Sequence, residues 1–180
     1  MALQPRPLFR RLRLEVTEKT RPDGSIAIPL DHASIDVAIA RLREAQVASV
    51  AICLLHSYAN PAHERLVAAA VRAALPGVAV SVSHEILPEI KEYPRTSTTV
   101  VNAYVQPIVR AYLTSLAARL QALGIAAPLH LMQSNGGLAS AETATRFPVR
   151  IVESGPAAGV VGAAALAKAL REPQLVTFDM

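Results

Sequence analysis

Polar residues that could do chemistry follow the ends of several short apolar runs in this sequence of 180 residues. Short continuous apolar runs are typical of strands in a parallel sheet that is covered on both faces. The carboxyl ends of such strands meet at one edge of the sheet, where ligands bind in open α/β folds. We therefore expect a ligand site at this edge, built from His56, Ser83-His84, Ser134-Asn135, Glu153-Ser154 and Asp179.

The last part of the sequence has the strongest local pattern. Two apolar runs, 151–153 and 175–178, flank a run of small residues that predicts a helix over about 156–170. Pro156 suits the first helical position, and Ser154 is a candidate N-cap. The pattern predicts a strand, a helix and a strand in that order.

The glycines of this predicted helix, Gly155 and Gly159, carry no side chain that would block an approaching group. A ligand or a neighbouring strand could therefore come close to the helix backbone. The alternative interpretation is a buried helix that packs closely on a sheet and binds nothing.

Two histidines, His56 and His63, could bind a metal ion together with Glu64, since imidazole and carboxylate groups suit Zn or Mn. The spacing between the histidines crosses a loop, and no further protein ligand is evident. The alternative is that His63, in the first turn of a predicted helix, faces solvent.

Two further loops carry candidate binding groups. Asn135-Gly136-Gly137 predicts a turn that tolerates positive φ and can present backbone N–H groups to an anion, although an ordinary glycine turn has the same sequence. The segment YPRTSTT offers the aromatic ring of Tyr93, the guanidinium of Arg95 and four hydroxyl groups, although it could also be a helix-capping segment.

The elements that must position these residues follow from periodicity and turn signals. Two strands, 12–16 and 25–30, flank the turn residues Pro22-Asp23-Gly24. Further strands are predicted over 47–55, 78–83 and 128–134, and helices over 34–46, 61–75 and 98–123. Loop chemistry dominates from His84 to about 97, Pro107 is expected to kink or divide its helix, and a short helix is expected from Ser140 or Glu142 to Pro148.

Composition narrows the class of protein. Apolar residues make up 52% and aromatic residues 4%, which favours a globular α/β domain with an aliphatic core. The net charge of +4 is concentrated near the N-terminus without interleaved aromatic residues, so we expect no nucleic-acid partner. The single cysteine excludes an intramolecular disulfide, and no long uncharged apolar run or cleavable leader is present, so we expect a cytoplasmic protein without a membrane partner.

Five sequence blocks resemble, in the same order, the hydantoinase A/5-oxoprolinase family. The blocks are LLHSYANPAHE, EILPEIKEYPRTSTTVVNAYVQP, LMQSNGGL, ESGPAAGVVGAA and TFDM. The resemblance implies an α/β lobe of the actin-like (ribonuclease H-like) ATPase superfamily, with a mostly parallel sheet and flanking helices. Neither Gly-Gly-Thr phosphate loop of that superfamily is present. We therefore expect residues 1–180 to be one domain, a central fragment of a two-lobed subunit, with 171–180 beginning the strand toward the second lobe.

The activity that the resemblance implies is the use of ATP and Mg²⁺ to activate a cyclic amide, such as a hydantoin or 5-oxoproline, for hydrolytic ring opening. It implies that Asp179 binds Mg²⁺ and takes part in catalysis. It also places Ser154, Gly155, Gly159 and Asn135-Gly136-Gly137 beside the nucleotide, and Tyr93 and Arg95 beside the substrate, although Pro94 replaces the acidic residue usual in the family.

Alternatives remain at this stage. Related carboxylase subunits, such as those of acetone carboxylase, use ATP on ketones or bicarbonate and share these blocks. The isolated chain could also be a non-catalytic α/β module that packs on another lobe and is itself inactive. The resemblance further implies a second subunit or domain of the hydantoinase B type.

Overall fold

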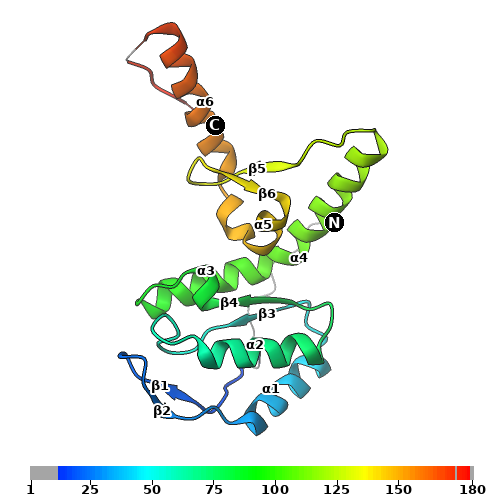
Figure 1. Ribbon diagram of the computed structural model, residues 1–180, viewed down its shortest axis with the longest axis vertical. Helices are drawn as coiled ribbons and strands as arrows, with labels where there is room; N and C mark the ends of the chain where they lie inside the picture. The colour runs from blue at the N-terminus through cyan, green and yellow to red at the C-terminus, as the bar shows by residue number, and fades with distance from the viewer. Residues whose placement is uncertain (1–11, 173, 179–180) are drawn as a thin grey trace. The chain divides into compact units, whose positions relative to one another are not determined.

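The computed structural model describes residues 12–172 and 174–178 (Figure 1). The chain divides into two compact units, Met1–Ala103 and Tyr104–Met180, and the boundary lies within the long helix α4 (Glu92–Ala122). Helices and short strands alternate along the chain, so the fold class is α/β, as predicted.

The first unit opens with an antiparallel hairpin of β1 (Lys19–Thr20) and β2 (Ile26–Ile28). Its turn is held by Asp23, whose carboxylate accepts hydrogen bonds from the backbone N–H and the hydroxyl of Ser25 at 2.9 and 2.7 Å. Gly24 takes a φ of +84° in this turn, a conformation that glycine adopts without strain. A hairpin around the predicted turn is therefore present. β2 lies within the strand predicted over 25–30, whereas β1 lies outside the strand predicted over 12–16.

The strand predicted over 12–16 is wrong, because these residues pair with no strand of the described chain. The next residue, Thr17, bonds to the start of the first helix: its N–H donates to Ser34 Oγ at 2.9 Å, and its carbonyl accepts from the N–H of Asp31 at 2.9 Å. The backbone groups of Thr17 are therefore not available to a partner strand.

Two helices and two parallel strands form the body of the first unit. The helices α1 (His32–Glu44) and α2 (Ala62–Ala74) alternate with β3 (Ser49–Ile52) and β4 (Ala79–Val82), which pair in parallel over all four residues. These elements confirm the helices and strands predicted for this stretch. The parallel pairing is confined to β3 and β4, since the other two sheets of the described chain are antiparallel hairpins.

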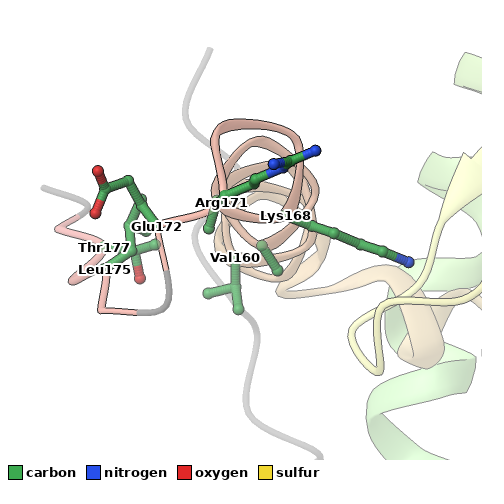
Figure 2. A pocket seen from close by; sticks show the side chains of 8 residues that line it. Val160, Lys168, Arg171, Glu172, Leu175 and Thr177 are labelled. Atoms are coloured by element: carbon green, nitrogen blue, oxygen red, sulfur yellow. The ribbon is translucent and has the colours of Figure 1, made fainter.

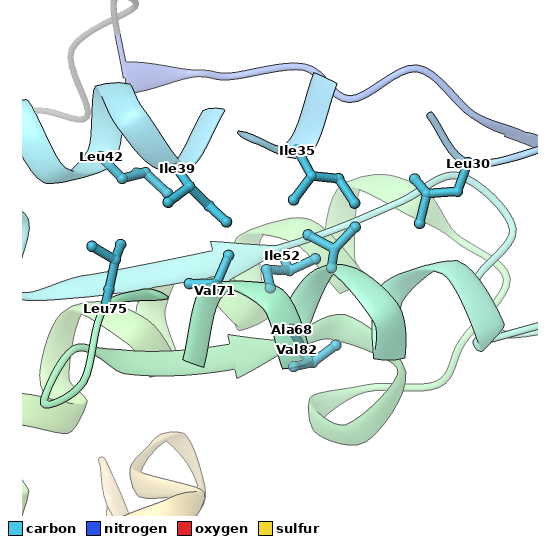
Figure 3. Packing of buried hydrophobic residues seen from close by; sticks show 10 residues of the cluster. Leu30, Ile35, Ile39, Leu42, Ile52, Ala68, Val71, Leu75 and Val82 are labelled. Carbon is cyan, nitrogen blue, oxygen red and sulfur yellow. The ribbon is translucent and has the colours of Figure 1, made fainter. Parts of the chain in front are cut away.

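The apolar core of the first unit lies between these helices and strands (Figure 3). Its members recur at helical spacing in α1 and α2, and Ile52 of β3 and Val82 of β4 complete the cluster from the strands. Each large aliphatic side chain that is removed from water contributes roughly 1.5–3 kcal/mol. The buried cluster comprises Leu30, Ile35, Ile39, Leu42, Ile52, Val67, Ala68, Val71, Leu75 and Val82.

The segment after β4 is more helical than predicted. A one-turn helix, α3 (Ser83–Ile86), follows the strand directly, and α4 begins at Glu92, within the predicted loop. Pro94 does not prevent this, because it lies in the first turn of α4, where a backbone N–H would have no intrahelical acceptor.

Of the two outcomes predicted for Pro107, a kink or a division, the division does not occur, because α4 remains one helix of 31 residues with Pro107 inside it. A proline removes one donor, but the turns on either side keep their own hydrogen bonds. Beside it, the Gln106 amide donates to the carbonyls of Thr145 and Arg146, both at 3.3 Å, which fixes this part of the helix against α5 (Ala141–Arg146).

The second unit contains the predicted glycine turn between β5 (His130–Met132) and β6 (Leu138–Ser140), which pair antiparallel. β6 was not predicted. Ser140 is the N-cap of α5, and its hydroxyl accepts a hydrogen bond from the N–H of Thr143 at 3.1 Å. After the 3-10 turn η2 (Pro148–Ile151) comes α6 (Ser154–Leu170), which matches the predicted helix of small residues.

The two strands predicted on either side of α6 are not formed in the described residues. Ile151 ends η2, and residues 152–153 form a turn. Just before it, the carbonyl of Arg150 accepts hydrogen bonds from the N–H of Ser134 at 2.7 Å and from the Ser134 hydroxyl at 2.9 Å. Residues 175–178 have no strand partner in the part of the chain that the structure describes. An extended segment is assigned to a sheet only when another strand pairs with it.

None of the helices within the described residues combines the length and the apolar character that crossing a bilayer requires.

Candidate functional site

A buried carboxylate, that of Glu64, lies at the carboxyl ends of β3 and β4. Glu64 is in the first turn of α2 and is 0% exposed. Its Oε1 accepts hydrogen bonds from the N–H of Leu54 at 2.8 Å and the hydroxyl of Ser83 at 2.6 Å. Its Oε2 accepts from the N–H of His84 at 3.0 Å and lies 2.7 Å from His84 Nδ1. The carboxylate therefore joins the chain after β3 to the chain after β4.

These hydrogen bonds fix the tautomer of His84. A carboxylate can only accept, so the neutral imidazole must carry its hydrogen on Nδ1, and its Nε2 keeps a free lone pair. Within the described residues Nε2 has no protein partner, and the side chain is 10% exposed. The pair resembles the carboxylate–imidazole arrangement that orients a catalytic base.

The hydroxyl of Ser57 extends the network by one step. Ser57 Oγ and Ser83 Oγ are 3.0 Å apart, and both residues are buried. Because Ser83 gives its only hydroxyl hydrogen to Glu64, Ser57 must be the donor to Ser83. The order of donors and acceptors is therefore determined throughout this network.

Leu54, the anchor of the loop after β3, is held on both sides of its peptide backbone. Its N–H donates to Glu64, and its carbonyl accepts from Arg95 Nη2 at 3.0 Å. Arg95 is 1% exposed, donates from Nη1 to the carbonyl of Glu89 at 3.0 Å, and lies 5.6 Å from the ring centroid of Tyr58. Its Nε has no hydrogen-bond partner among the residues that the structure describes. Arg95, predicted to contact substrate, is placed here to hold a loop.

The histidines predicted as metal ligands have different partners. His56 takes a φ of +58°, which is strained for a residue with a side chain, and its ring meets the edge of Tyr58 at 5.9 Å between centroids. His63 Nδ1 lies 2.7 Å from Glu18 Oε2. The described residues contain no group of three or more His, Cys, Asp or Glu side chains that could hold a metal ion.

The thiol of Cys53 lies close to this network without being activated by it. Burial, and then the negative charge of Glu64, raise the pKa of Cys53 to about 11. The thiol is therefore protonated at neutral pH and has little nucleophilic character.

The turn at Asn135-Gly136-Gly137 uses most of its backbone donors internally. The N–H of Gly136 donates to the carbonyl of Gln133 at 3.0 Å, and the N–H of Gly137 donates to Asn135 Oδ1 at 2.9 Å. The N–H of Ser134 is taken by Arg150. In this conformation the predicted anion-binding turn has few free amides to offer.

The start of α6 has fewer engaged backbone amides than this turn. Glu153 is the N-cap, and no side chain accepts from the first-turn amides, so Ser154 is inside the helix and does not cap it. A Cβ added to Gly155 or Gly159 would meet nothing within 4 Å. Positive partial charge and free amides at such a helix start suit an anionic group.

A groove of about 600 Å³ lies at the other end of α6 (Figure 2). The groove is lined by mostly apolar residues of the helix and of the following segment and by charged residues at and just after the helix end: Val160, Ala164, Ala167, Leu175, Thr177, Lys168, Arg171 and Glu172. In the close view the side chain of Lys168 extends away from Leu175 and Thr177. The groove is far more apolar than the network around Glu64.

Two further residues predicted for the site are Tyr93 and Asp179. Tyr93 is 84% exposed at the start of α4, where a ligand can reach its ring. Asp179, the predicted Mg²⁺ ligand, lies outside the described residues.

The sequence indicated Ser83-His84 as candidate site residues but did not pair them with Glu64, which it suggested only as a possible metal ligand. A signal was present. Glu64 stands four residues before Ala68 and three before Val67, so its position belongs to the buried stripe of α2. A carboxylate on such a stripe needs buried donors to bond with.

Two family models match the chain. The Hydantoinase/oxoprolinase N-terminal region matches residues 2–75, and Hydantoinase/oxoprolinase matches residues 95–180. Among curated relatives, caprolactamase subunit alpha of Pseudomonas jessenii is 42% identical over 171 residues, which cover 95% of this chain and 25% of that protein. The 5-oxoprolinase of Saccharomyces cerevisiae is 37% identical over 134 residues, which cover 73% of this chain and 10% of that protein.

Two solved structures have the same fold as this chain. The ATP-dependent caprolactamase of Pseudomonas jessenii is 41% identical with a TM-score of 0.84, over 94% of this chain and 25% of that chain. A nucleotide-free acetone carboxylase is 31% identical with a TM-score of 0.75, over 87% of this chain and 22% of that chain. The chain spans about a quarter of the length of its first relatives. It belongs to the hydantoinase/oxoprolinase family.

Proposed function

We propose that this chain is part of an ATP-dependent enzyme that activates a cyclic amide by phosphoryl transfer for hydrolytic ring opening. The observation that carries the proposal is the match to the ATP-dependent caprolactamase, at 41% identity and a TM-score of 0.84 over 94% of the chain. The similarity to a 5-oxoprolinase supports the same substrate class, because both names describe the cleavage of a ring amide.

The chemistry explains why such a reaction uses ATP. An amide carbon is a weak electrophile, because the nitrogen lone pair is delocalised onto the carbonyl group. A phosphoryl group on the carbonyl oxygen makes that oxygen a good leaving group, so that water can attack the carbon. Positioning and neutralisation of negative charge are then the main tasks of the protein.

Among the described residues, the start of α6 fits a phosphate group best. The amides of Ser154 and Gly155 have no side-chain cap, and the space beside Gly155 and Gly159 is open. We propose Asp179, which follows this segment, as the residue that orients Mg²⁺. The turn at Asn135-Gly136-Gly137 is a weaker candidate for phosphate binding, since its amides are largely engaged.

The exposed ring of Tyr93 is proposed to contact the substrate, and Arg95 to act indirectly by holding Leu54. The relative named caprolactamase subunit alpha supports a second subunit as partner. A carboxylase that uses ATP on a ketone or bicarbonate is the second candidate function, favoured by the match to acetone carboxylase at a TM-score of 0.75.

Substrate-dependent ADP release by a full-length enzyme that carries this sequence, assayed with its partner subunit, separates these candidates. We expect ADP release to rise with caprolactam, 5-oxoproline or hydantoin and to be accompanied by the ring-opened acid. Stimulation by acetone with bicarbonate, and by no cyclic amide, would replace the first proposal with the second.

A pair of variants tests the place of the nucleotide. In the full-length enzyme, Gly155→Val is expected to abolish ATPase activity, because the new side chain occupies the open start of α6. Ala163→Val, in the middle of the same helix, adds similar bulk and is expected mainly to cost stability, on the order of 1–3 kcal/mol. Equal loss of ATPase activity at matched folded fraction would argue against a phosphate site at Gly155.

A further inference from the structure

We propose that His84 is the proton acceptor for the amide N–H of the cyclic substrate, and that Glu64 is the residue that positions it. This inference rests on the proposed function, because it names a group that acts in the same reaction. It uses a side-chain pair that the family match does not assign.

The first support is the state of the ring. Both oxygens of Glu64 are filled by donors, which leaves Nδ1–H of His84 bonded to Oε2 at 2.7 Å and Nε2 free of protein partners within the described residues. The exposed 10% of the His84 side chain gives a ligand limited access to the ring. A general base that removes a proton from a substrate needs such a lone pair, held in a fixed orientation within hydrogen-bond reach of that proton.

The second support is the energetic cost of this arrangement. A carboxylate that is 0% exposed is retained at a desolvation cost that an apolar side chain of similar volume would avoid. Glu64 nevertheless bonds the backbone on both sides of the strand pair, at Leu54 and His84. A requirement for a fixed orientation of the His84 ring would explain why the chain retains this desolvation cost.

The third support is position. His84 follows β4, and the loop that begins at Leu54 follows β3, so both lie where ligands bind in parallel sheets. In the same loop His56 is strained at a φ of +58°, and strained residues of this kind cluster at functional sites.

The proposed step balances as follows. The carbonyl oxygen of the cyclic amide forms a bond to the γ-phosphorus of ATP, and the bond from that phosphorus to the bridging oxygen breaks, releasing ADP. The amide N–H proton moves to Nε2 of His84, and its electron pair forms the C=N bond of an O-phosphorylated imidate. Glu64 holds Nδ1–H and stabilises the imidazolium that results.

The chain supplies a matched control for this idea. His63 also bonds a carboxylate through Nδ1, at 2.7 Å from Glu18 Oε2, but it lies in the first turn of α2 and does not follow a parallel strand. An asparagine at either histidine can place its amide N–H near the position of Nδ1 and keep the bond to the carboxylate, while Nε2 is lost.

The experiment compares His84→Asn with His63→Asn in the full-length enzyme, by lactam-dependent ADP release and by melting temperature. We expect His84→Asn to lower kcat at least about 100-fold, with a small change in melting temperature, and His63→Asn to keep kcat within about threefold. Near-normal kcat for His84→Asn, or an equal loss for both variants, would overturn the proposal.

A second readout does not depend on turnover. Diethyl pyrocarbonate acylates an unprotonated imidazole nitrogen, and peptide mass spectrometry locates the modified histidine. We expect modification of His84 to slow at least fivefold when caprolactam is bound, with no protection of the exposed His130. If the wild type releases ADP with lactam but His84 is not protected, the inference fails and the proposed function stands. If no cyclic amide stimulates the wild type, both fail.

Discussion

Helix α2 buries five of its residues, including the charged Glu64, whereas α6 buries none of its seventeen residues. The polarity of α6 does not explain the contrast, because all but three residues of this helix are alanine, glycine, valine or leucine. Four of its large residues, Val160, Val161, Leu166 and Leu170, are each more than two-fifths exposed.

The difference shows that burial depends on what surrounds a helix more than on its composition. α2 is covered by α1 and by the strand pair, so even its carboxylate finds four hydrogen bonds. α6 is apolar but lacks such a cover among the described residues. Stability in this chain should therefore be concentrated in the first unit.

The largest expected effect comes from removing the carboxylate. Glu64→Ala leaves the N–H of Leu54, the hydroxyl of Ser83 and the ring of His84 without their acceptor, and should cost about 3–5 kcal/mol. Chemical denaturation of the 180-residue chain measures this cost. Glu44→Ala, at an exposed position near the end of α1, is the control and should change stability by less than about 0.5 kcal/mol. Similar values for both variants would mean that the network contributes nothing specific.

The next prediction compares an apolar side chain of the buried core, in α1, with an exposed apolar side chain of α6. Ile35 is 2% exposed and Leu166 of α6 is 55% exposed. Ile35→Ala should cost about 3 kcal/mol, because it removes buried surface and leaves a cavity. Leu166→Ala should change the free energy of unfolding of this chain by less than about 0.5 kcal/mol. A large cost for Leu166→Ala would show that α6 is covered in solution.

The thiol beside the network gives a pH-dependent effect. The pKa of Cys53 is raised from 9.0 to about 11, mainly by burial, so the unfolded chain loses this proton at lower pH than the folded chain. The resulting stability is fully present below pH 9 and is lost as the pH rises to about 11, an effect on the order of 2–3 kcal/mol. Denaturation across this range should show the wild type losing more stability than Cys53→Ala. Parallel curves for the two proteins would contradict the raised pKa.

The smallest effect separates two glycines of the second unit. Gly136 has a φ of +82°, and an added Cβ would lie 3.0 Å from Val161 Cγ2, so Gly136→Ala should cost about 1 kcal/mol or more. Gly159 lies inside α6 with open space around it, so Gly159→Ala should stabilise the chain by about 0.5–1 kcal/mol through helix propensity. Melting temperatures that move in opposite directions would support this contrast, and a loss for both would mean that α6 is packed more closely at Gly159.

Local signals in the sequence were enough to determine much of the fold. Helical spacing and end signals predicted α1, α2 and α6 within a few residues, because capping and periodicity act over one or two turns. The run 78–83 predicted β4, and the glycines at 136 and 137 predicted the turn before β6. The resemblance of five sequence blocks to the family was confirmed by the family models.

Long-range contacts decided the rest. The strands predicted over 151–153 and 175–178 did not form in the described chain, because a strand requires a partner that no local pattern supplies. α4 began earlier than predicted, since Pro94 lies in its first turn, where proline costs little. The candidate site shows the same limit. The sequence placed His84 at the end of a strand, but only the folded chain brings the carboxylate of Glu64, twenty positions earlier, within 2.7 Å of its ring. That pairing depends on the parallel register of β3 and β4, which the sum of many weak packing contacts sets and no single residue encodes.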